Sequence, residues 1–595
     1  MSQLSYRIDV QRPALRTIAV TLRFAGDWGT GEGSLSLFVP AWTPGSYLIR
    51  DFARHFGPVL AADDASGTPL ECRKQGMNRY QVAAGEAVRR IRVEYTVYAH
   101  ELSVRTAHFD REFAFWNPAN ILLWPVGRRD IAARFEVLVP EGWDLACPLR
   151  PERTGGGAFR FEASGIDEAM DAPCLAARLA KIEWQVRGVS HRALLAGHEP
   201  VVPPERLRSD LSAISEQAAR VFGFVPYPDY SFLVMCSDAG RGGLEHANCS
   251  VLQANRSWLV DGKDYRRRFL GLAAHELFHA WNVKRMRPDD LWEVDYERAA
   301  HSELLWLAEG FTAYYDDRIC LLAGILELSD YLEILGKNAT SMLSAPGRGK
   351  QSLCEASHDA WIRFYRPDED TRNSTQNYYV NGSLVALAWD SAIRRRSAGT
   401  RSLDDFLRTL WRETFEKDRG YTMADVESAL REALLGDDAA TRALLDLVRR
   451  PLDLDLEPFL EPAGLSLSQE DPDKPYLGIG FRSGSTEIAY VNDGSPAQEA
   501  GLAPGDEILA LDGLRVLGEN WGDLYRCLAR VGRPIRILVS SHGRIAERSA
   551  VPSVSAVGTW KVALVESPTP EQIAFRERWF APAARQHRGG TGTAD

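Results

Sequence analysis

Hydrophobic and polar residues alternate through much of the first 175 residues of the chain. The clearest runs are Leu35, Leu37 and Val39, and then Ile91, Val93, Tyr95 and Val97. Alternation of this kind is typical of strands with one buried face, and turn signals such as Pro44-Gly45 separate the runs. We therefore predict an N-terminal β domain over residues 1–175, folded as an antiparallel sandwich or saddle.

The pattern changes after about residue 200. Hydrophobic positions recur at helical spacing near 207–221 and over long stretches from 264 to about 450, with a buried strand expected at 228–237. A segment rich in Pro and Asp ends the helical part, and strand patterns return after Tyr476. We expect a multidomain α+β chain with divisions at 1–175, 176–345, 346–462, 463–560 and 561–595, the last being a terminal helix and a disordered tail.

One motif in the helical part carries recognisable chemistry. His275 and His279 lie four residues apart, so both imidazoles project from one helix face and can bind the same metal ion. Glu276 lies next to His275 and can reach a water molecule at that ion. With a third protein ligand and one open position, the arrangement fits catalytic zinc. A chance pair of histidines on a helix is the alternative interpretation.

A candidate third ligand follows further along the chain. Glu309 is separated from His279 by 29 residues and is the only charged residue of the apolar helical stretch 305–315. A lone carboxylate on an apolar helix face is unfavourable unless something pairs with it, and a zinc ion is such a partner. The alternative is a Glu that is exposed at the start of a helix.

The stretches HELFHAW and WLAEGFTAYY resemble the gluzincin metallopeptidases, whose third zinc ligand is a Glu on a second helix. Within that group the sequence is most similar to the PDZ-bearing glycyl aminopeptidase family (peptidase family M-sixty-one), and more distantly to aminopeptidase N. The resemblance implies zinc bound by His275, His279 and Glu309, in a thermolysin-like catalytic domain at 176–345 with a helical extension at 346–462. Ala308 replaces the Asn of aminopeptidase N, so substrate rules from that enzyme do not transfer directly.

A glycine-rich segment resembles the substrate-binding motif of the same peptidases. In Gly242-Gly243-Leu244-Glu245-His246, the resemblance implies that Glu245 binds the α-ammonium of the substrate and that Gly242 and Gly243 pair with the peptide as an edge strand. A carboxylate is the partner that an ammonium needs out of water, and glycines allow close backbone approach. Without the resemblance, the segment is better interpreted as an ordinary glycine-rich loop.

A tyrosine pair resembles a third element of the catalytic machinery. The segment Asn377 to Gly382 is similar to the part of aminopeptidase N whose Tyr donates to the tetrahedral oxyanion, which implies this role for Tyr379, with Tyr378 as the second choice. A tyrosine hydroxyl supplies a proton without adding charge, as an oxyanion donor should. By itself, such a pair is more often part of a hydrophobic core.

The C-terminal strand region resembles a PDZ domain. Residues 476–481 match the loop that receives a carboxylate in such domains, and residues 495–513 match the bacterial PDZ pattern. We therefore expect a PDZ domain at 463–560. It either binds the C-terminus of a peptide by β-augmentation or only packs against the catalytic part.

Composition narrows the choice of partners. The 595 residues are 45% hydrophobic and 25% charged, as in a folded protein, and the formal net charge of -11 argues against nucleic acid or a membrane surface as a partner. No apolar run is long enough to cross a bilayer.

The eight cysteines are scattered, so any metal is held by His and Glu. We expect a cytoplasmic location, or a periplasmic one if a signal peptide has been removed.

These features predict a zinc metallo-aminopeptidase. Glu276 is expected to act as general base, Tyr379 to stabilise the oxyanion, and Glu245 to hold the free N-terminus. The resemblance implies a preference for small N-terminal residues, Gly or Ala. Two other functions stay open: a zinc endopeptidase of the same fold, and a non-catalytic adaptor that works through its PDZ domain.

Overall fold

The computed structural model describes residues 3–26, 33–85, 87–197, 202–238, 240–554 and 558–581. The tail that we expect to be disordered, from about 582, lies outside the described residues. The chain divides into two compact units, one formed by Met1–Ala300 with Asp418–Gly420 and the other by His301–Lys417 with Tyr421–Asp595. Each unit is described in turn.

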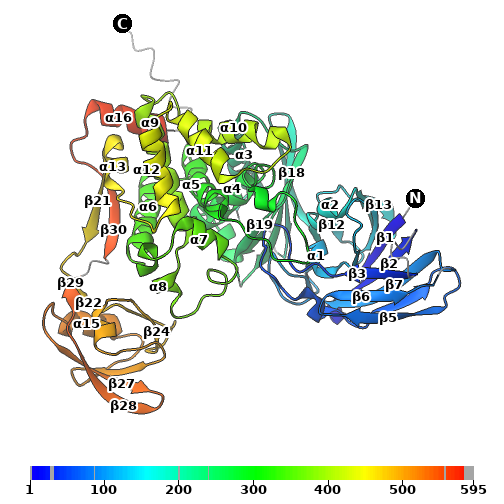
Figure 1. The fold of residues 1–595 in the computed structure, drawn as a ribbon, viewed down its shortest axis with the longest axis horizontal. Helices are drawn as coiled ribbons and strands as arrows, with labels where there is room; N and C mark the ends of the chain where they lie inside the picture. Colours follow the sequence, from blue (N-terminus) through cyan, green and yellow to red (C-terminus); the bar gives the residue numbers. More distant parts are fainter. Residues whose placement is uncertain are drawn as a thin grey trace, which may run out of the picture. The chain divides into compact units, whose positions relative to one another are not determined.

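The first unit opens with a β domain that has two sheets. The larger sheet contains, in spatial order, β10 (Trp124–Pro125), β3 (Ser34–Phe38), β6 (Arg79–Ala83), β5 (Pro69–Gln75), β4 (Leu60–Asp63), β7 (Arg90–Tyr98), β2 (Thr17–Ala25), β1 (Gln3–Asp9), β11 (Ala133–Leu138), β14 (Ala158–Ala163) and β13 (Glu152–Gly155). The smaller sheet has β12 (Asp144–Ala146), β15 (Cys174–Ala177), β9 (Phe113–Trp116) and β8 (His108–Phe109). Figure 1 shows much of the larger sheet in blue.

The predicted alternation is confirmed in this domain. In β7 the side chains of Ile91, Val93, Tyr95 and Val97 are at most 4% exposed, whereas the residues between them face outward. One strand pair differs from the expectation of an antiparallel sheet, because β1 and β11 run parallel. The long segment between these strands gives the chain room to cross over and enter the sheet again in the same direction.

A third sheet of the first unit packs against the helices α3 and α4. Its order is β16 (Ala180–Val186), β17 (Val189–Ala196), β18 (Asp229–Ser237), β20 (Cys249–Asn255) and β19 (Gly242–Glu245), with β19 at one edge. Helix α3 (Pro204–Phe222) packs on α4 (Leu270–Phe278), and α4 packs on β19 and β20 (Figure 1). The rings of Phe222 and Trp281 stack with their centroids 5.7 Å apart, which fixes the C-terminal end of α4 against α3.

The second unit is helical around a buried centre. Its helices are η6 (Trp306–Phe311), α5 (Thr312–Leu322), α6 (Leu328–Leu343), α7 (Leu353–His358), α8 (Thr371–Ser374), α9 (Tyr378–Arg396), α10 (Leu403–Glu413), α11 (Met423–Ala433), α12 (Asp438–Arg449), α13 (Glu457–Leu460) and α16 (Pro570–Phe580). Helix α9 is buried on nearly all sides, as a central helix should be. Figure 1 shows α9 beside α6 and α12.

The PDZ domain is inserted between two paired strands of the second unit. Strand β21 (Leu465–Glu470) pairs with β30 (Thr559–Leu564), and β30 packs on α6. Between them lie β22 (Pro475–Tyr476), β23 (Ile479–Phe481), β24 (Ile488–Val491), α14 (Pro496–Glu499), β25 (Glu507–Leu511), β26 (Leu514–Arg515), α15 (Trp521–Leu528), β27 (Ile535–Ser541), β28 (Arg544–Ala550) and β29 (Ser553–Val554). The described helices include none long and apolar enough to span a bilayer.

Candidate active site and metal centre

Helix α4 carries the first two predicted metal ligands. The ring centroids of His275 and His279 lie 4.7 Å apart, so the two imidazoles share one face, as their spacing predicts. His279 is 1% exposed and Glu276 is 5% exposed. A buried carboxylate beside two imidazoles is the arrangement that a cation with one open position requires.

The orientation of His279 suits metal binding. Its Nδ1 lies 2.7 Å from the carbonyl oxygen of Asn282, so the ring donates its N–H there and leaves Nε2 as the lone-pair nitrogen. Backbone hydrogen bonding of this kind fixes the tautomer of metal-binding histidines in proteins. The hydroxyl of Tyr230 donates to the carbonyl oxygen of Glu276 at 3.2 Å and holds this turn of α4 against β18.

Glu245 lies at the end of strand β19 and faces the same region. Glu245, Glu276 and His279 are all buried, and each offers an oxygen or nitrogen atom within 4.8 Å of the others. The first unit therefore brings the carboxylate predicted to hold the substrate amine next to the predicted general base.

The glycines of strand β19 have different surroundings. A Cβ on Gly243 would lie 1.9 Å from Oε1 of Glu276, so no side chain fits at this position. A Cβ on Gly242 would meet the nearest atom, of Val104, at 3.4 Å, which is ordinary contact. Steric crowding by the general base Glu276 therefore requires glycine at position 243. Position 242 has room for a Cβ atom.

A buried ion network lies behind Glu245. Asp171, which follows α2 (Ile166–Met170), accepts hydrogen bonds from Nδ1 of His246 at 2.9 Å, from the backbone N–H of Ala247 at 2.9 Å and from Nζ of Lys284 at 2.8 Å. Burial alone would raise the pKa of Asp171, but the charges of Lys284 and His246 outweigh it and hold that pKa well below its usual range. The N-terminal domain therefore anchors the residues that follow Glu245.

Glu309 belongs to the second unit and lies in η6, which is a π-helix rather than the α-helix that the spacing suggests. A Cβ on Gly310 would lie 2.5 Å from Cα of Gly382, so η6 and α9 cross backbone to backbone. This close crossing fixes Glu309 relative to the first turn of α9. π-Helical turns inside longer helices occur frequently at functional sites.

The two candidate tyrosines begin helix α9. The side chain of Asn377 caps the helix by accepting from the backbone N–H groups of Tyr379 and Val380, at 3.1 and 3.2 Å. The hydroxyls of Tyr379 and Tyr365 lie 2.9 Å apart. Burial and the negative charge of Glu309 raise the pKa of Tyr379 well above its usual value, so this phenol keeps its proton. Tyr378 is fully buried, whereas Tyr379 is only half-buried.

The predicted site residues therefore fall into two sets. His275, Glu276, His279, Glu245 and Gly243 come together in the first unit, and Glu309 and Tyr379 lie close to each other in the second. The meeting of the two sets around one zinc ion stays a prediction. Sequence reasoning missed Asp171 and Tyr365, because neither lies in a recognisable motif.

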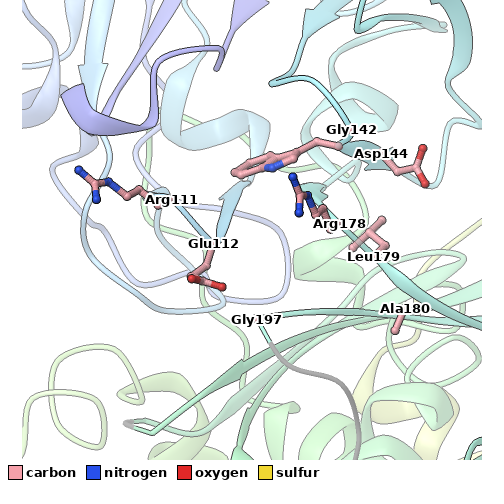
Figure 2. A pocket seen from close by; sticks show the side chains of 9 residues that line it. Arg111, Glu112, Gly142, Asp144, Arg178, Leu179, Ala180 and Gly197 are labelled. Carbon is pink, nitrogen blue, oxygen red and sulfur yellow. The ribbon is translucent and has the colours of Figure 1, made fainter.

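A cavity of about 800 Å³ in the first unit is not part of this site. It is lined by Arg111, Glu112, Gly142, Trp143, Asp144, Arg178, Leu179, Ala180 and Gly197. Figure 2 shows the side chains of Arg111, Glu112 and Asp144 pointing in different directions rather than toward a common centre. None of the lining residues belongs to α4 or β19, and the cavity offers no convergent set of polar groups.

Known proteins resemble this chain both in sequence and in overall fold. Residues 268–385 match the model of the M61 glycyl aminopeptidases, residues 5–178 match the M61 peptidase N-terminal domain, and residues 487–540 match a PDZ domain. A crystal structure of an aminopeptidase N family protein from Idiomarina loihiensis is 26% identical, with a TM-score of 0.90 over 98% of this chain and all of that one. A Clostridium perfringens protein named as a zinc metalloprotease is 31% identical over 100 residues, which cover 16% of this chain and 30% of that protein.

These domains and the motif on α4 define a zinc metallopeptidase. More narrowly, the chain matches the models of both M61 glycyl aminopeptidase domains and of a PDZ domain, which confirms the resemblance that the motifs indicated. The multidomain α+β architecture, with an N-terminal β-sheet domain, a helical catalytic region and a C-terminal PDZ domain, is confirmed as well.

Proposed function

We propose that this chain is an aminopeptidase that releases small residues, Gly or Ala, from the N-terminus of peptides. The observation that carries the proposal is the position of Glu245. Its buried carboxylate lies within 4.8 Å of Glu276 and His279, where the α-ammonium of a substrate can bind if the first peptide bond is to reach the general base. The family description of glycyl aminopeptidases supports the preference for small residues.

The residues of the site fit a zinc ion. His275, His279 and Glu309 would hold it, since the fixed tautomer of His279 leaves Nε2 for a metal, while Glu276, the carboxylate of α4, would serve as the general base. When bound, zinc acts as a Lewis acid toward the scissile carbonyl and lowers the pKa of water to about 7.

The chain's own residues then carry the reaction. Glu276 accepts the proton of the attacking water and returns it to the leaving amine. Tyr379 donates its hydroxyl proton to the developing oxyanion, and the hydroxyl of Tyr365, 2.9 Å away, is placed to donate to Tyr379 so that the proton of Tyr379 points to the substrate. Glu245 neutralises the α-ammonium, and the edge strand β19 pairs with the peptide backbone.

The PDZ domain is proposed to bind a peptide C-terminus along β23. Within the described residues β23 pairs with β24 on one side. The ring centroids of Phe481 on β23 and Trp521 on α15 lie 4.8 Å apart, so β23 and α15 are neighbours, as a β-augmentation groove requires. The domain also contacts the helices, because Asn373 donates to the carbonyl oxygen of Val491 at 2.8 Å and Arg372 to Asn492 at 3.1 Å. These contacts use β24 and the turn after it, so packing and peptide binding are compatible.

A cytoplasmic location is proposed from the cysteines. All eight are free thiols, and six of them are buried in the way that small core residues are. A reducing compartment suits such a set.

A panel of aminoacyl p-nitroanilides tests the aminopeptidase proposal. We expect hydrolysis of the free Gly and Ala substrates, at least about a hundredfold slower hydrolysis of the N-acetylated forms, loss of activity with a chelator and recovery with added zinc. Equal rates on free and N-acetylated substrates would support the endopeptidase instead. Purified protein without stoichiometric zinc and without turnover would support the adaptor.

A further inference from the structure

A turn of the N-terminal domain lies against the carboxylate of Glu245. A Cβ on Gly45 would lie 2.7 Å from Oε2 and 2.8 Å from Oε1 of Glu245, closer than any real side-chain carbon could approach. Gly45 has a φ of +84°, and the backbone N–H of Ser46 donates to the carbonyl oxygen of Thr43 at 3.0 Å. With Pro44 before the glycine, these features fit a type II turn, which requires a positive φ at its third residue.

The turn is held rigidly from outside the site. Trp42, which precedes it, is fully buried, stacks on Tyr296 at 4.9 Å and donates from Nε1 to the carbonyl oxygen of Arg298 at 2.7 Å. The backbone N–H of Ala41 donates to the carbonyl oxygen of Tyr296 at 2.7 Å. Moving the turn away from Glu245 would break these hydrogen bonds and the packing of the buried Trp42 ring, which opposes such a movement.

Hydrogen bonds also anchor the two residues that follow Glu245 in the chain. His246 and Ala247 both donate to Asp171, and Lys284 completes the network. The backbone N–H of Lys284 also donates to the carbonyl oxygen of His279 at 2.9 Å. The backbone after Glu245 is therefore anchored, and the carboxylate of Glu245 lies between the Gly45 turn and the residues of α4.

We infer that the turn Thr43–Ser46 is the wall that closes the subsite for the substrate's N-terminus, and that Gly45 is a specificity-determining residue. The inference rests on the proposed function, in which Glu245 binds the α-ammonium. An ammonium pairs with Glu245 from the side of α4, whereas an N-acyl group or a preceding residue would meet the backbone of the turn and bring a carbonyl oxygen toward a carboxylate. The wall therefore makes the site favour substrates with a free N-terminus over substrates with an N-acyl group or a further residue before the cleaved one.

The variant Gly45→Ala tests the wall, and Gly67→Ala is its matched control. Gly67 has a φ of +74° and nothing within 4 Å of a new Cβ, so both variants strain the backbone in the same way and only the methyl group at 45 meets Glu245. We expect the KM for Gly and Ala p-nitroanilides to rise at least about tenfold in Gly45→Ala with a much smaller change in kcat, and both constants to stay within about twofold in Gly67→Ala.

A second variant works in the opposite direction and does not crowd the core. Pro44→Gly loosens the turn, and we expect the ratio of kcat/KM for free over N-acetylated substrates to fall at least about fivefold. An unchanged ratio, together with equal KM values in Gly45→Ala and Gly67→Ala, overturns the wall. A wild-type protein that prefers N-acetylated substrates overturns the proposed function instead, so the two failures are distinguishable.

Discussion

At the scale of single residues, neighbouring groups orient the side chains of His279 and Tyr379 through hydrogen bonds. His279 donates from Nδ1 to the carbonyl oxygen of Asn282, which leaves Nε2 for a metal. Tyr379 shares a hydrogen bond with Tyr365, which decides where the proton of Tyr379 can point. In both cases a neighbouring group, not the reactive residue itself, determines the orientation that the chemistry needs.

The variant Tyr365→Phe tests this point for the oxyanion. Without the Tyr365 hydroxyl at 2.9 Å, the hydroxyl of Tyr379 loses this hydrogen-bond partner, and we expect kcat on alanine p-nitroanilide to fall about tenfold while KM changes little. Tyr378→Phe is the comparison, because Tyr378 is fully buried. If Tyr378→Phe lowers kcat and Tyr365→Phe does not, Tyr378 is the oxyanion donor and the assignment to Tyr379 is wrong.

At the scale of elements, two close crossings position the catalytic groups. Strand β19 lies against α4 at Gly243, where no side chain fits beside Glu276, and η6 crosses α9 at Gly310 and Gly382. At the crossing of η6 and α9 the two backbones meet directly and leave little freedom for relative sliding, whereas at Gly243 the backbone of β19 meets the side chain of Glu276. The carboxylates of Glu276 and Glu309 are thus placed by glycines on neighbouring elements.

The link between α2 and the end of β19 yields a prediction on stability. Asp171→Asn leaves Lys284 buried without its carboxylate, and we expect the free energy of unfolding at pH 7 to fall by about 3 kcal/mol. The pKa of Asp171 is lowered in the folded protein, so its contribution is complete above its unfolded pKa of about 3.9 and is lost as the pH falls below that value. Thermal unfolding at pH 7 and in acid measures both effects.

Asp167→Asn is the control for this prediction. Asp167 lies on α2, which Asp171 follows, and pairs with Arg129, but its side chain is 60% exposed, so the loss should be below about 1 kcal/mol. If Asp171→Asn is no more destabilising than this control, the ion network does not anchor the site.

At the scale of the whole molecule, motifs that are local in sequence were predictable and long-range partners were not. The spacing of His275 and His279, the lone carboxylate of Glu309 and the PDZ turns identify the peptidase and PDZ domains, which the comparisons confirm. Gly45 lies 200 residues before Glu245, and Asp171 lies 75 residues before His246. The Pro44-Gly45 pair marks a turn, but no local pattern shows which distant residues Gly45 and Asp171 contact. Only the fold brings them to Glu245.

Which strands pair with each other is also a long-range property that the sequence pattern does not predict. Alternation predicts that β1 and β7 are strands with one buried face, and both are. Alternation does not encode which strand lies beside which, so the parallel pair of β1 and β11 could not be predicted. Likewise, the pairing of β21 with β30, which makes the PDZ domain an insertion, depends on strands on either side of that domain.

The most direct test of the central claim is the variant Glu276→Gln, measured for bound zinc and for turnover together. Gln has the shape of Glu but cannot accept the proton of water, and the three metal ligands are untouched. We predict stoichiometric zinc by elemental analysis and a kcat on alanine p-nitroanilide reduced at least about a hundredfold. Retained turnover with zinc bound would contradict the account, because the peptidase mechanism proposed for this chain has no other general base.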